Sequence, residues 1–421
     1  MIHRWIYAII TASFGLGLAL LGVESGLQIK ARIFDDPKGT EIAGVWRKAN
    51  ALQSSRIDVY PLLVPAMFIL GALAHMEGVT SNGLLTPRGR VFPLGALPLK
   101  LNVSAKEGDT WPFFTTDEFG FNNPIGQHVP DTIDVALVGD SMCHGTTGEP
   151  WENLAGWLRR SGYKVLNLCQ GGSGPLLELG ILGEYALPLR PKRVVWLFFE
   201  GNDFRDLASE LGVDLLVRYL DEPAHQRLRE RQDEITPSLL AAYRELNDWF
   251  KANDSVLVGM TRMRMIRGLL MSRLRTPVPV EVPRVPDDQV AMLARILKIA
   301  RERTEAVGAS FHVVYLPDAN NRFFSEKNAR VQKANAQAVR SVLMGLKIDV
   351  LDYFNECLAT VQDPLSLFPG RQRGMHYNAN GYRLMAECIE THILGTRSAT
   401  RTSIHASGNV SDRAHRDPRS R

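Results

Sequence analysis

Cysteine is scarce in this chain of 421 residues, and its net charge of +4 is small. The four cysteines are Cys143, Cys169, Cys357 and Cys388, and they form no C-x-x-C or Cys/His spacing, so the sequence predicts no metal site. They are either four small buried thiols or, outside the cytoplasm, paired, with Cys357 and Cys388 as one possible pair. The weak positive charge gives no reason to expect a nucleic-acid partner.

The N-terminus lacks the small-residue A-x-A pattern that follows the apolar core of a cleaved signal peptide. Arg4 precedes nineteen uncharged, mostly apolar residues from Trp5 to Val23, which is near the length that crosses a bilayer. We therefore predict a cytoplasmic tip at 1–4 and an uncleaved transmembrane signal anchor at 5–28. The protein would be single-pass in the inner membrane with its main domain periplasmic or extracellular, although Lys30 and Arg32 weaken the orientation signal. The alternative is a buried N-terminal helix.

Three further regions follow the predicted anchor. Residues 30–130 are rich in Gly, Pro and Asn over their second half and predict a lead-in of short strands and loops packed against the next domain. Residues 131–395 form the main domain. Residues 396–421 have almost no apolar content and are predicted to be disordered.

The main domain alternates short apolar runs with longer amphipathic segments, which predicts an α/β fold with a parallel sheet. A helical, polar insertion at 205–285 follows the third strand. The predicted strands are 133–138, 164–168, 193–199, 310–316 and 348–351, and the predicted helices are 149–161, 176–187, 287–307, 326–346 and 378–394.

Four polar segments fall at the ends of these elements. Gly139-Asp140-Ser141 follows the first strand, where a serine is well placed as a nucleophile, because ligands bind at the carboxyl ends of parallel strands. A glycine-rich segment at 170–174 follows the second strand, and Asn202 follows the third. His376 precedes the last helix. Each segment alone is also typical of an ordinary turn.

In their order and placement, the four segments resemble the four sequence blocks of the SGNH (GDSL-type) hydrolases, over residues 131–395. The segments at 116–124, 139–145 and 196–203 also resemble a membrane-anchored bacterial subgroup of that superfamily. The resemblance implies a flavodoxin-like, three-layer α/β/α fold with five parallel strands and no cofactor. It implies that Ser141 is the nucleophile and His376 the base, with an oxyanion hole made by the amides of Ser141 and Gly172 and the side chain of Asn202. Gly172 is preferred to Gly171 because it lies five residues after Asn167, which is the family's spacing.

One residue that is typical of the superfamily is missing from this chain. Many members of the superfamily carry an Asp two or three residues before the histidine, where this chain has Arg373 and Gly374. We take Asp363 as the first candidate for the acid that orients His376 and Asp352 as the second. A backbone carbonyl in place of an acid, or an inactive site, are the alternatives.

The function that the resemblance implies is a serine esterase that removes an acyl group, most simply acetyl, from a carbohydrate or lipid through an acyl-enzyme. An O-acyltransferase with polysaccharide-biosynthesis partners is the first alternative, because both reactions share the acyl-enzyme. The second alternative is a non-catalytic glycan-binding or scaffold protein, which the missing Asp favours.

Overall fold

A computed structural model describes residues 42–65, 79–80, 83–107, 111–253, 284–372 and 376–395. The predicted signal anchor, the C-terminal tail and the second half of the predicted insertion lie outside these residues. Among the described residues, no helix combines the length and the apolar composition that crossing a bilayer requires.

The fold is organised around one sheet of five parallel strands, β7 (Val135–Gly139), β8 (Val165–Asn167), β9 (Arg193–Phe199), β10 (Ser310–Leu316) and β11 (Asp349–Asp352). The strands lie in the order β11-β10-β9-β7-β8, and every neighbouring pair is parallel. Numbered along the chain, this is the order 2-1-3-4-5 of flavodoxin-like sheets. The predicted α/β fold with a flavodoxin-like sheet is therefore confirmed.

Helices cover both faces of this sheet, because alternate strand residues point to opposite sides. Ala136, Trp196 and Val313 pack with α6 (Pro175–Ile181), α12 (Asp287–Ala306) and α14 (Glu326–Gly345). Leu137, Leu197 and Val314 pack with α5 (Leu154–Arg160) and α15 (Ala379–Ile389). The sheet and the helices packed on each of its two faces form the three predicted layers.

The connection after β9 is helical over its described part, as predicted. It contains α7 (Asp203–Glu210), α8 (Asp214–Val217) and the long α9 (Gln232–Asn253). After β10 the chain forms α13 (Ala319–Phe324), and after β7 it forms the short α4 (Ser141–His144).

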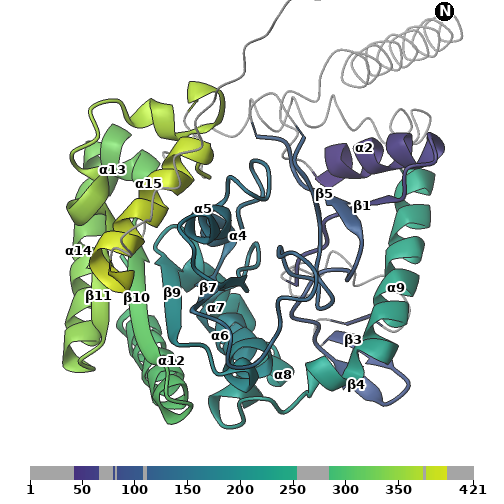
Figure 1. The fold of residues 1–421 in the computed structure, drawn as a ribbon, viewed down its shortest axis with the longest axis horizontal. Coiled ribbons are helices and arrows are strands. Elements are labelled where there is room, and N and C mark those ends of the chain that lie inside the picture. Colours follow the sequence, from purple (N-terminus) through teal and green to yellow (C-terminus); the bar gives the residue numbers. More distant parts are fainter. Residues whose placement is uncertain are drawn as a thin grey trace, which may run out of the picture.

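The lead-in differs from the prediction because it starts with a helix, α2 (Ile42–Ser54). Two small sheets follow, one of β1 (Val59–Pro61), β5 (Leu101–Val103) and β6 (Phe113–Thr115), the other of β2 (Val79–Thr80), β3 (Gly83–Thr86) and β4 (Gly89–Val91). Trp46 of α2 stacks on Tyr243 of α9, with ring centroids 4.9 Å apart. Figure 1 shows α2, β3 and β4 along α9, to one side of the main sheet. Trp46 and Phe92 belong to the same apolar core as β7 and β9, so the lead-in is an integral part of the fold.

Candidate active site

Ser141 lies where β7 ends and α4 begins. All five residues of β7 are buried, and Asp140 caps the helix by accepting a 2.8 Å hydrogen bond from the Met142 amide. Burial raises the pKa of Asp140 to about 6, against the opposing effects of the Met142 amide and of His376. The buried strand and the capped turn hold the serine at the carboxyl edge of the sheet.

His376 reaches this serine from the loop that precedes α15. Its Nε2 lies 2.8 Å from Ser141 Oγ, which is hydrogen-bond distance for transfer of the hydroxyl proton. Asp140 Oδ2 is a more distant neighbour of the same hydroxyl, at 3.3 Å. Ser141 and His376 are 235 positions apart in the chain, and the structure brings them together, as the resemblance implies.

The other ring nitrogen of His376 is hydrogen-bonded to a residue that the sequence did not single out. His376 Nδ1 donates to Glu107 Oε1, and both side chains are mostly buried. A carboxylate only accepts hydrogen bonds, so it keeps the proton on Nδ1 and leaves Nε2 free to accept from Ser141. Burial lowers the pKa of His376, but the hydrogen bond and charge of Glu107, together with the charge of Asp140, raise it above the ordinary value.

Glu107 comes from the lead-in, just after β5, and is 269 residues from His376 in sequence. The sequence patterns of the main domain offer no signal for Glu107, because its contact with His376 depends on how the lead-in folds back.

Asp363, our first candidate for the acid, is not at His376. Its carboxylate accepts a 2.9 Å hydrogen bond from Arg371 on the surface, and about half of its side chain is exposed. Asp352, the second candidate, pairs with Arg340 and Asn355 at the end of β11. Both predictions of the acid are corrected to Glu107, because each aspartate is held by a cation or an amide of its own region.

The glycine-rich segment lies beside Ser141, and the structure distinguishes the two candidate amides. The Gly171 N–H donates to His144 Nδ1 at 3.1 Å and is therefore occupied. Within the described part of the chain, no partner is recorded for the Gly172 N–H, and Gly172 has a positive φ of 71°. Gly172, preferred from its spacing, is thus the amide that remains available to an oxyanion.

Asn202 also lies near the turn at Asp140 and Ser141, at the start of α7. Its Nδ2 donates to Asp206 Oδ2 at 2.6 Å, and a hydrogen bond from its side chain is among the effects that lower the pKa of Asp140. These two carboxyl groups hold the amide next to Ser141. To bind an oxyanion, the Asn202 side chain would have to share an N–H that it already donates to Asp206 or Asp140.

The lead-in segment 116–124 braces this region. Asp117 accepts hydrogen bonds from the Phe119 and Phe121 amides, each 2.9 Å long, and from Asn123 and His128. Asn122 in turn donates to the carbonyl oxygen of His144 at the end of α4. The segment therefore ties the lead-in to α4, the helix that begins with Ser141.

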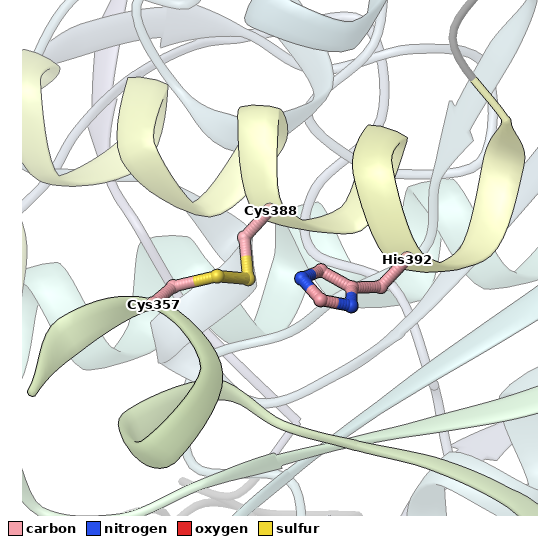
Figure 2. Close-up of side chains that lie close together, drawn as sticks. All are labelled: Cys357, Cys388 and His392. Atoms are coloured by element: carbon pink, nitrogen blue, oxygen red, sulfur yellow. A yellow bond between two sulfur atoms is a disulfide. The ribbon is translucent and has the colours of Figure 1, made fainter.

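One group among the described residues has the donor atoms of a metal site. Cys357, Cys388 and His392 lie close together, but the two sulfur atoms are joined in a disulfide, and the imidazole lies beside it (Figure 2). A metal binds thiolates, and here both sulfur atoms are engaged in the disulfide, so the group is not a metal site in this oxidised form. The second disulfide joins Cys143 and Cys169, so all four cysteines are paired, which decides between the two alternatives left open by the sequence.

No protein-family model matches the sequence, and no protein of curated function matches it. Among solved structures, the chain is similar to a lipase/acylhydrolase from Enterococcus faecalis, with 13% identity, a TM-score of 0.35, and 63% of this chain and 100% of that chain covered. It is also similar to the esterase EstA from Pseudoalteromonas sp., with 11% identity, a TM-score of 0.31, and 63% and 97% covered. A third similar structure is a GDSL-like lipase from Bacteroides thetaiotaomicron, with 13% identity, a TM-score of 0.30, and 64% of this chain and 89% of that chain covered. The fold stated above follows from the strand order of this chain and does not depend on these likenesses, whose TM-scores are low.

Proposed function

We propose that the protein is a serine hydrolase of the SGNH type that cleaves esters through an acyl-enzyme on Ser141. The observation that carries the proposal is the continuous chain of hydrogen bonds from Ser141 Oγ to His376 Nε2 and from His376 Nδ1 to Glu107. A serine hydroxyl is a weak nucleophile until an adjacent base takes its proton, and that base must be oriented by a third group.

The reaction has two half-steps. Ser141 Oγ attacks the ester carbonyl carbon while His376 Nε2 takes the hydroxyl proton, and the resulting oxyanion is stabilised by the Gly172 and Ser141 amides and by Asn202. The bond to the alcohol then breaks, and His376 gives the proton to the departing oxygen. In the second half-step, water attacks the carbonyl carbon of the acyl-enzyme while His376 takes a proton from it. His376 then returns the proton to Ser141 Oγ as the carboxylic acid leaves.

The non-catalytic alternative loses its main support. It was favoured by the absence of an acid before His376, and Glu107 supplies a carboxylate from a different part of the chain. A protein that kept only the fold would have no need of a base held between a serine and a carboxylate.

The substrate we propose is an acyl ester of a carbohydrate or lipid outside the cytoplasm. Two disulfides support an oxidising compartment, where such bonds persist. The apolar N-terminal run supports attachment to the inner membrane. Transfer of the acyl group to a sugar hydroxyl instead of water remains part of the proposal, because it uses the same acyl-enzyme.

The full chain, purified in detergent, should hydrolyse p-nitrophenyl acetate, and Ser141→Ala should abolish the turnover. Adding mono- and oligosaccharide acceptors and measuring acylated products by mass spectrometry separates transfer from hydrolysis. A folded wild-type protein that neither turns over the ester nor forms an acyl-enzyme would overturn the proposal.

A further inference from the structure

The glycine loop, which we define as residues 168–174, has to present one backbone amide at a fixed place. It contains Gly171, Gly172 and Gly174, and glycine has more conformational freedom than any other residue. An oxyanion donor stabilises a transition state only when it is already in position. Something outside the loop must therefore restrain it.

The restraint comes from α4, the helix that begins with Ser141. Cys143, two residues after the nucleophile, is joined by a disulfide to Cys169, three residues before Gly172, and both cysteines are fully buried. Gly139 makes room for this bond, because a Cβ at position 139 would lie 2.8 Å from Cys143 Sγ.

A second contact acts on the next part of the loop. His144 is buried, and its Nδ1 accepts the 3.1 Å hydrogen bond from the Gly171 amide. Burial, followed by the charge of His376, lowers the pKa of His144 to about 3, so the imidazole stays neutral and able to accept. At the far end of the loop, Glu210 accepts from the Gly174 amide at 2.5 Å.

We infer that the Cys143–Cys169 disulfide and His144 together form a clamp that holds the Gly172 N–H in position for the oxyanion formed at Ser141. The inference rests on the proposed function and assigns Cys143, Cys169 and His144 as positioning residues. The nucleophile and the oxyanion donor are then parts of one covalently closed unit, and full catalytic activity requires that the disulfide has formed.

The chain carries its own matched control for this inference. The Cys357–Cys388 disulfide closes a sequence separation of 31 residues against 26 for Cys143–Cys169, so removal of either bond should lower the unfolding temperature similarly. Cys388 lies in α15, roughly 14 Å along the helix from its start near His376, at 1.5 Å per residue. Cys357 follows β11 and Cys388 lies within α15, so neither cysteine of the control belongs to α4 or to the glycine loop.

The test compares the full-length wild type with Cys143→Ala/Cys169→Ala and Cys357→Ala/Cys388→Ala. We expect the first variant to lose at least about 10-fold in kcat for p-nitrophenyl acetate, toward the roughly 10²–10³-fold of a missing oxyanion donor, with KM nearly unchanged. The second variant should keep the wild-type kcat although its unfolding temperature falls.

His144→Phe gives an independent result if the first variant does not fold. It keeps an aromatic ring against Phe114, whose centroid is 5.6 Å away, but removes the acceptor of the Gly171 amide. We expect a lower kcat at unchanged KM here too. Equal kcat values in all folded variants and an active wild type would overturn the clamp and leave the proposed function standing. An inactive wild type would instead overturn the proposed function.

Discussion

Replacing Glu107 by Gln tests how far the histidine depends on the lead-in. The substitution keeps the size of the side chain and removes the negative charge that His376 Nδ1–H contacts. In a serine–histidine–carboxylate triad, the equivalent neutral substitution lowers kcat by about 10⁴, and we expect a fall of roughly 10²–10⁴ here. That corresponds to about 3–5 kcal/mol of lost transition-state stabilisation.

The pH dependence should change in a defined direction. His376 acts as a base only when it is neutral, so kcat/KM falls as the pH drops through its pKa. Glu107 raises that pKa against the lowering effect of burial. Without the carboxylate charge the pKa of His376 falls, and the acid limb of the profile should move to lower pH while the plateau drops.

The assay is the pH profile of kcat/KM for p-nitrophenyl acetate, measured on the wild type, Glu107→Gln and Asp363→Asn. Asp363→Asn is the matched control, because it removes a carboxylate that pairs with Arg371 on the surface. Its profile should superimpose on that of the wild type. An acid limb that shifts in Asp363→Asn and not in Glu107→Gln would refute the assignment of the acid.

Two further predictions concern the oxyanion hole and the stability of the fold. Asn202→Ala should lower kcat about 10²-fold with little change in KM, measured by steady-state kinetics; an unchanged kcat would show that Asn202 only ties Asp140 to Asp206. Removing the Cys357–Cys388 disulfide by double Ala substitution should lower the free energy of unfolding by about 3.5 kcal/mol, measured by denaturant titration. A change near zero in the free energy of unfolding would mean that the bond does not restrict the unfolded chain, because that chain is already compact without it.

The sheet was predictable from local patterns, and two of the candidate site residues from the resemblance of the four polar segments. Apolar runs of β-branched and aromatic residues mark β9 and β10, whose observed bounds match the predicted ones. Ser141 and His376 were singled out because the four polar segments resemble the SGNH blocks in order and placement, and the structure places Ser141 Oγ 2.8 Å from His376 Nε2.

Glu107 and α2 were not predictable in the same way. The acid has only to reach one ring nitrogen, and any carboxylate in the chain can do so if the fold returns it there. Local patterns around position 107 carry no information about a contact that spans 269 residues. The helix α2 was missed because its apolar residues pack in two directions that only the folded chain defines. Val45 and Ala49 pack with Val59 of β1 and Val103 of β5, whereas Trp46 stacks on Tyr243 of α9.

The central claim is that Ser141 is an activated nucleophile. The most direct measurement is labelling of the folded, full-length chain with a serine-reactive fluorophosphonate, followed by mass spectrometry of the peptide that contains position 141. We expect one phosphonate per chain, on Ser141, with labelling lost in Ser141→Ala and slowed in Glu107→Gln. Labelling on another residue, or none on a folded wild type, would contradict the account.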